Sequence, residues 1–123
     1  MTGAFPELLL QLFDVTKEID VETRSEDGAV HRVPIWVVVV DGEVYVRSVR
    51  GPRGRWYREL LARRSAVLHV GSRGVEVRPV KVTATETIDE VSAGFWRKYE
   101  RSASLFSMLR LSTLHTTLRL EPA

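Results

Sequence analysis

The most constraining feature of the sequence is an aspartate–glycine pair, Asp41-Gly42, between two apolar runs. Such a pair is typical of a two-residue hairpin turn of type I′, in which both turn residues need a positive φ angle. The run 30–40, which contains four consecutive valines, therefore predicts one strand, and the run 43–48 predicts its antiparallel partner. A two-residue turn at this point also fixes the register of the pair, with Val39 opposite Val44.

This register sorts the side chains of the hairpin onto two faces. We expect one face to form the core of the sheet, with Val33, Ile35, Val37, Val39, Val44, Val46 and Ser48. The opposite face carries Trp36, Val38, Tyr45 and Arg47, with Trp36 opposite Arg47. A monomer would expose that second face as an apolar patch, so we expect a homodimer that covers it, with Arg47 at the rim of the interface. The alternative is that a helix of the same chain covers this face.

Periodicity along the rest of the chain predicts the remaining elements. Strands are expected where apolar and polar residues alternate or apolar residues cluster, over 19–25, 66–70, 75–84 and 113–120. Helices are expected where apolar residues recur at helical spacing, over 1–14, 55–64 and 88–101. We expect the first helix to pack on the sheet, and Thr87 with Glu90 to cap the last one. Meandering strands with few helices are typical of a small, mostly antiparallel barrel.

Two local features of the strands bear on the register. The alternation in the run 75–84 slips at Pro79, which predicts a bulge there. The turn at Glu26-Asp27-Gly28 allows two registers for the first hairpin. A two-residue loop would place Val21 on the Trp36 face, whereas a three-residue loop with a bulge would return it to the core.

Composition excludes several classes of protein. The chain has no cysteine, and its three histidines, His31, His69 and His115, match no metal-ligand spacing. Neither a secretory signal nor an apolar run of membrane-spanning length is evident, so we expect a soluble cytoplasmic protein without a membrane partner. The net charge of +2 is low for a nucleic-acid-binding protein, which makes that function a minor alternative.

The arginines are concentrated in one segment, with seven of them in the range 47–64. Arg53, Arg55 and Arg58 stand at the expected start of a helix, where the helix dipole is positive and acidic residues are favoured. This arrangement is unfavourable unless an anion lies among the arginines, and a phosphate would suit the free N–H groups of a helix start. We expect Gly51 and Gly54 to let the backbone approach such a ligand. The alternative is a solvated basic loop.

Three segments resemble a known family. They are Arg-Val-Pro-Ile-Trp at 32–36, Asp-Gly-Glu-Val-Tyr-Val at 41–46 and Trp-Tyr-Arg-Glu-Leu-Leu-Ala at 56–62, the last following a basic glycine turn. Together they resemble the deazaflavin-dependent nitroreductases and the wider flavin-binding split barrels, which include pyridoxamine phosphate oxidase. The resemblance implies a single domain over 1–123, mostly β with flanking helices, folded as a six-stranded antiparallel split barrel of the FMN-binding type. It also supports a homodimer, because split-barrel flavoproteins build their sites between two subunits.

The resemblance also implies a cofactor site. The ring would lie near Arg32, Pro34, Ile35 and Trp36. The phosphate or ribityl chain would be held by Arg47 and Ser48 from the strand and by Arg50, Gly51, Arg53, Gly54 and Arg55 from the loop, with Trp56 anchoring the helix.

The function that follows is binding of a flavin-type nucleotide, either a deazaflavin coenzyme or FMN. As an oxidoreductase, the protein would transfer hydride from the reduced cofactor to a small organic acceptor, with no catalytic side chain. The alternative is a non-catalytic flavin-nucleotide-binding module. The segment 102–112 is apolar and irregular, and either closes over the ring or, as we expect, packs on the barrel.

Overall fold

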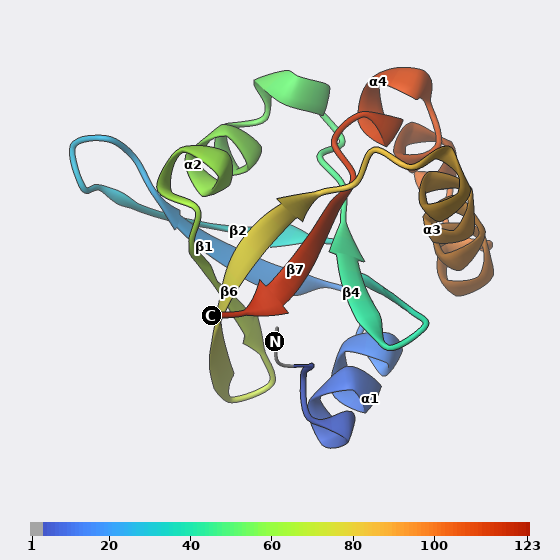
Figure 1. The fold of residues 1–123 in the computed structure, drawn as a ribbon, viewed down its shortest axis with the longest axis horizontal. Coiled ribbons are helices and arrows are strands. Elements are labelled where there is room, and N and C mark those ends of the chain that lie inside the picture. The colour runs from blue at the N-terminus through green and yellow to red at the C-terminus, as the bar shows by residue number, and fades with distance from the viewer. Residues whose placement is uncertain (1–3) are drawn as a thin grey trace.

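The chain curls one antiparallel sheet into a half-barrel with helices around it (Figure 1). The computed structural model describes residues 4–123. The strands are β1 (Ile19–Arg24), β2 (Val30–Ile35), β3 (Val38–Val40), β4 (Glu43–Val46), β5 (Ala66–Val70), β6 (Arg73–Lys81) and β7 (Leu118–Pro122). The helices are α1 (Glu7–Val15), α2 (Arg55–Arg63), α3 (Thr85–Tyr99) and α4 (Leu111–Leu114), with 3-10 turns η1 (Gly51–Arg53) and η2 (Leu105–Met108). None of the helices within residues 4–123 is long and apolar enough to cross a membrane.

The sheet has seven strands in the order β2-β1-β5-β6-β7-β4-β3. The expected count of six is wrong because the run 30–40 forms two strands, one at each edge of the sheet. Only Trp36 and Val37 separate these edge strands in the chain. Two edges joined so closely require the sheet to curl back on itself, which produces the half-barrel.

The helix α3 satisfies the backbone at this crossing. The N–H of Val37 donates to the Tyr99 hydroxyl over 3.3 Å, and the Val37 carbonyl accepts from Lys98 Nζ over 2.6 Å. The Tyr99 hydroxyl in turn donates to the carbonyl of Lys17. Val37 is fully buried, so these side chains replace the ladder hydrogen bonds that its backbone would otherwise lack. Trp36 stacks flat on Tyr99, with ring centroids 3.9 Å apart.

The hairpin at Asp41-Gly42 is confirmed. Both residues have positive φ, 51° and 75°, and Val39 pairs with Val44 as expected. The predicted core face is also confirmed. Ile35, Val37, Val44 and Val46 lie in the main hydrophobic cluster, and Val33 and Val39 pack against it.

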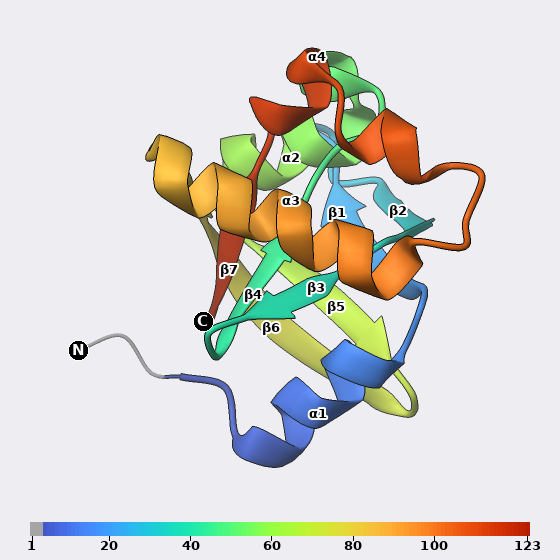
Figure 2. The same ribbon diagram turned by 90° about the vertical axis from the view of Figure 1, so that its right-hand side faces the viewer.

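The second face of the hairpin is buried within the chain. Val38 and Tyr45 form a second hydrophobic cluster with Val91, Phe95 and Tyr99 of α3, together with Leu105 and Met108. Figure 2 shows α3 running across β3 and β4. The alternative of a covering helix therefore holds, and the expected apolar patch does not exist. The homodimer loses the support of that patch and stays a prediction.

In the first hairpin, formed by β1 and β2, Val21 lies on the core face. Arg24 pairs with Val30, which leaves a five-residue loop from Ser25 to Ala29. This odd loop length places Val21 opposite Val33, and Val21 is buried in the main cluster.

Three other local expectations are wrong. The β6–β7 ladder runs without interruption past Pro79, because Pro79 continues the buried face of Val75 and Val77 while Val80 lies half-buried on the other face. Helix α3 begins at Thr85, so Thr87 lies inside its first turn and caps nothing. The final strand starts at Leu118, since residues 113 and 114 belong to α4.

The two helices before β5 cover the half-barrel core. Helix α1 buries Leu9, Leu10 and Phe13 against it, which confirms the expected packing, while residues 1–3 of the predicted helix lie outside the described residues. Helix α2 buries Tyr57 and Leu60. The N-terminus of α2 comes directly after the loop that follows β4, and it lies at one end of the half-barrel (Figure 1).

The Tyr99 hydroxyl provides a test of the edge crossing. Tyr99→Phe removes the acceptor of the buried Val37 N–H, so we expect the free energy of unfolding to fall by about 1–3 kcal/mol. Tyr57→Phe is the matched control, because the hydroxyl of this buried tyrosine makes no hydrogen bond to any described residue. Urea denaturation of both variants measures the difference. An equal loss in the two proteins would contradict this account of the crossing.

Candidate functional site

The loop between β4 and α2 is shaped by Ser48 and two glycines. Ser48 Oγ donates to the carbonyl of Gly51 over 2.8 Å, and the Ser48 N–H donates to Thr116 Oγ1 over 2.9 Å. Gly51 has a φ of 68°, which favours glycine. At Gly54 a Cβ atom would lie 2.3 Å from Ser48 Oγ. Both glycines are therefore required by the turn itself, a reason that the sequence argument missed.

Two adjoining pockets flank this loop. The first, here called the arginine pocket, has a volume of about 390 Å³ and is lined by Ser48, Arg50, Gly54 and Arg55 among others. The second, here called the inner pocket, has about 250 Å³ and is lined by Ile35, Trp36, Arg47 and Met108 among others. Pro34, Val49 and Trp56 line both pockets, so the two adjoin, and together they are here called the groove.

The structure brings nine of the twelve expected site residues to this groove: Pro34, Ile35, Trp36, Arg47, Ser48, Arg50, Gly54, Arg55 and Trp56. Three lie outside it. Arg32 Nε donates to Asp20 Oδ2 over 2.8 Å on the sheet surface. Gly51 is buried in the turn against Ser112, and Arg53 belongs to the η1 turn and lines neither pocket.

The arginine pocket has an excess of positive charge. Across residues 4–123, Arg50 and Arg55 form no ion pair or side-chain hydrogen bond, and both side chains are exposed. Helix α2 has no acidic residue in its first turn and no side-chain cap at Gly54. Its first N–H groups, starting at Arg55, therefore lack acceptors within the helix. Gly54 and Arg55 line the arginine pocket, so this helix start borders it. This arrangement suits an anion.

Arg47 occupies a different position from the one expected. It is only 1% exposed, because α3 covers it. Its guanidinium donates to Thr117 Oγ1, to Ser92 Oγ and to the carbonyls of Ile88 and Met108, all over 2.9–3.0 Å. Burial lowers the pKa of Arg47 to about 10, which still leaves it protonated at neutral pH. The expectation of a rim position is wrong, and Arg47 holds the wall of the inner pocket together.

The inner pocket contains residues that the site prediction missed. Met108, Ser104 and Ser107 line it from the segment 102–112, and Glu18 lines it from the residue before β1. This segment packs on the barrel as expected, with Leu105 and Met108 buried. Met108 also lines the inner pocket, and closure of the segment over a bound ring stays a prediction. Sequence spacing alone carries no signal for these contacts.

Two of the three histidines are engaged elsewhere. His69 Nε2 lies 2.9 Å from Glu22 Oε1, and His31 Nε2 lies 3.7 Å from Glu59 Oε2. Neither lines the groove. No group of three or more histidine, aspartate or glutamate residues within the described part of the chain could hold a metal ion.

The curled antiparallel sheet with its flanking helices defines a split barrel, of the kind found in flavin-related proteins such as pyridoxamine-phosphate-oxidase-like and FAD-binding proteins. The resemblance seen in the sequence is thereby confirmed. The chain belongs to the family described as "Uncharacterized protein conserved in bacteria (DUF2255)", whose model matches residues 9–120. No curated protein matches the sequence.

Three solved structures illustrate the similarity. ChuZ of Campylobacter jejuni superposes with a TM-score of 0.71 at 10% identity, over 94% of this chain and 50% of that one. The chain thus spans half the length of ChuZ. HutZ, the heme storage protein of Vibrio cholerae, has a TM-score of 0.64 at 12% identity, over 98% and 92% of the two chains. An F420-H2 dependent reductase has a TM-score of 0.61 at 14% identity, over 85% and 93%. At these identities the likeness shows the fold alone.

The close approach of Gly54 and Ser48 gives a test of the loop geometry. Gly54→Ala forces its Cβ onto Ser48 Oγ, so we expect it to destabilise the protein by roughly 1–3 kcal/mol. In the Ser48→Ala background the clash is absent, and the same substitution should cost much less. Urea denaturation of the two single variants and the double variant measures this coupling. Additive losses would contradict the described contact.

Proposed function

We propose that this protein binds a flavin-type nucleotide, a deazaflavin coenzyme or FMN, in the groove formed by the arginine and inner pockets. One observation carries the proposal. Arg50 and Arg55, which have no side-chain partner among residues 4–123, and an uncapped helix N-terminus lie at one end of a groove whose other walls are largely apolar and aromatic. A phosphate at one end and a flat ring along the rest is the ligand shape that suits this distribution.

The residues present fit such a cofactor. Arg50, Arg55 and the first N–H groups of α2 would hold the phosphate. Pro34 and Trp56 would contact the ring because they line both pockets, and Trp36 would contact it from the inner pocket. The arginine pocket alone, at about 390 Å³, lies within the usual range of roughly 300–1,000 Å³ for cofactor sites.

The inner pocket favours an oxidoreductase over a non-catalytic module. A ring that lies along Pro34 and Trp56, where the two pockets adjoin, leaves the far part of the inner pocket, which has about 250 Å³ in all, for a small acceptor. When bound, the reduced cofactor supplies the hydride, and the chain positions both partners and excludes water. Turnover of the reduced cofactor with small nitroaromatic or quinone acceptors separates this activity from simple binding.

Haem is a second cofactor to consider, because HutZ is a heme storage protein. A haem iron needs an axial ligand, most often histidine. No histidine lines either pocket in the described part of the chain, and Met108 is the sulfur-containing residue that lines the inner pocket. The groove therefore suits a flavin-type nucleotide better.

Titration of the purified protein with FMN and with deazaflavin coenzyme, followed by fluorescence, tests the proposal. We expect Arg50→Ala and Arg55→Ala each to weaken binding roughly 10- to 100-fold, because each removes charge-assisted hydrogen bonds of about 1.5–3 kcal/mol. Arg32→Ala is the control. It also removes an arginine, but one that pairs with Asp20 outside the groove, and it should leave the affinity unchanged. Absence of binding to both cofactors, or equal losses in all three variants, would refute the proposal.

A further inference from the structure

Arg47 places a positive charge beside the inner pocket. Among residues 4–123 it is the one charged residue that is buried, and it lines this pocket. No carboxylate within the same residues forms an ion pair with it. Its four acceptors are hydroxyl and carbonyl oxygens, which are neutral. They stabilise the guanidinium without cancelling its charge.

The hydrogen bonds of Arg47 also leave one donor over. A guanidinium has five N–H groups. The Nε group donates to Thr117, the two groups of Nη1 donate to Ser92 and Met108, and one group of Nη2 donates to Ile88. The second N–H of Nη2 has no acceptor in the described part of the chain. A buried donor on a charged group is costly to leave unpaired, so a ligand oxygen would supply what the chain does not.

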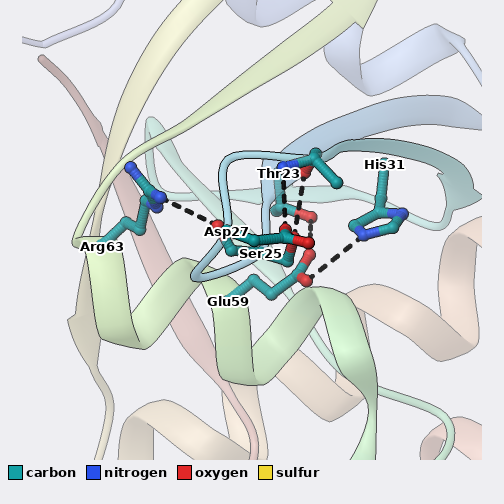
Figure 3. A network of polar contacts seen from close by, with 7 residues as sticks. Thr23, Ser25, Asp27, His31, Glu59 and Arg63 are labelled. Atoms are coloured by element: carbon teal, nitrogen blue, oxygen red, sulfur yellow. Dashed lines mark hydrogen bonds and ion pairs between the residues drawn. The ribbon is translucent and has the colours of Figure 1, made fainter.

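Glu59, another ionisable group with little exposure, shows the contrast (Figure 3). Its side chain is 11% exposed, and both of its oxygens face partners. Oε1 accepts from Thr23 Oγ1 over 2.7 Å, and Oε2 lies 3.7 Å from His31 Nε2. That network is satisfied within the chain and needs no ligand. Arg47 differs because neither its charge nor its last donor is matched.

The carboxylate that lines the inner pocket does not neutralise Arg47. Glu18 is exposed to solvent and forms no ion pair with the guanidinium. Burial lowers the pKa of Arg47 to about 10, whereas an adjacent carboxylate would raise it. The guanidinium is still charged at neutral pH, and apolar surroundings strengthen the attraction of such a charge for an anion.

The inner pocket limits the size and the charge of its ligand. Its volume of about 250 Å³ lies below the usual range of roughly 300–1,000 Å³ for cofactor sites. Ile35, Trp36 and Trp56 make its walls apolar and aromatic, which suits a flat apolar body. One unit of buried positive charge is balanced by one negative charge. A carboxylate therefore fits, whereas a phosphate dianion would bring an unmatched charge into an apolar pocket.

We propose that the inner pocket binds a small, flat carboxylate, one of whose oxygens accepts from the second Nη2 N–H of Arg47. This ligand is the organic acceptor of the proposed reaction, and that part of the inference rests on the proposed function. The acceptor then carries an acid group beside its reducible group. A neutral acceptor of the same shape would leave the buried charge unmatched and would bind more weakly.

Benzoate and benzamide are matched probes, because they differ in charge and hardly in shape. A nuclear magnetic resonance titration of the full chain without cofactor compares them. We expect benzoate to shift the Trp36 indole signal and to bind roughly tenfold more tightly than benzamide, because its hydrogen bond to Arg47 is charge-assisted. Salt screens a buried charge much less than an exposed one, so this advantage should persist at high salt. Equal affinities, or an advantage that salt removes, would show that the inference is wrong.

Variants identify the charge that benzoate recognises. Arg47→Gln should remove the advantage of benzoate and retain the binding of benzamide. Arg97→Gln, at an exposed position on α3, is the charge-matched control and should change neither affinity. An advantage that survives in Arg47→Gln would refute the inference. If thermal unfolding shows that Arg47→Gln does not fold, the salt dependence and the double variant described next decide the question.

The double variant Arg50→Ala/Arg55→Ala tests whether benzoate binds in the arginine pocket instead. Both side chains are exposed, so we expect the fold to be retained. The advantage of benzoate should persist, because Arg47 is untouched. Its loss in this variant would place the anion in the arginine pocket and would overturn the inference.

The outcomes separate the two proposals. An acceptor occupies its pocket together with the cofactor, so neither FMN nor deazaflavin coenzyme should displace benzoate, and displacement would contradict the inference. If a cofactor binds and benzoate has no advantage, the inference is wrong and the proposed function stands. If no cofactor binds and the advantage of benzoate depends on Arg47, the inner pocket is a carboxylate site and the proposed function is wrong.

Discussion

The buried guanidinium of Arg47 connects the parts of the molecule that enclose the groove. It follows β4 in the chain, and it donates to Ser92 and Ile88 on α3, to Met108 in η2 and to Thr117 before β7. A buried charge without a carboxylate partner is costly unless its N–H groups are satisfied, and here four oxygen acceptors compensate it. Arg47 also lies over the Phe95 ring, 5.2 Å from its centroid. Arg47 therefore helps to fix the position of α3 and of the segment after it.

The crossing between the sheet edges completes the framework. Trp36 lies where the chain leaves β2 for β3, and stacking on Tyr99 of α3 holds its ring in place. Lys98 secures the same crossing through the carbonyls of Phe13 and Val37, and burial lowers its pKa to about 8. The groove is thus lined by residues whose neighbours already fix them, and preorganisation of this kind reduces the entropic cost of binding a rigid ring.

Local signals predicted part of this structure. Asp41-Gly42 determined a hairpin and its register, because the turn type and the pleat leave one arrangement with a buried face. The break at Trp36 could not be predicted, since residues on both sides are apolar and extended. The register also placed Arg47 opposite the core correctly, but a two-residue period cannot tell whether solvent, a partner or α3 covers that face. For the site, the glycines and arginines of the loop between β4 and α2 predicted where one end of the groove lies. The contacts of Met108 and Ser104 depend on tertiary packing, which has no local pattern.

The central claim is that one groove, bounded by the start of α2 and by Trp36 and Trp56, receives a flavin-type nucleotide. The most direct measurement is a nuclear magnetic resonance titration of the labelled protein with FMN and with deazaflavin coenzyme. The account predicts that the backbone amides of residues 55–57 and the indole signals of Trp36 and Trp56 shift together and saturate at one ligand concentration, while the exposed Trp96 indole does not move. Shifts confined to Trp96 and its surroundings, or no saturable shift with either ligand, would contradict it.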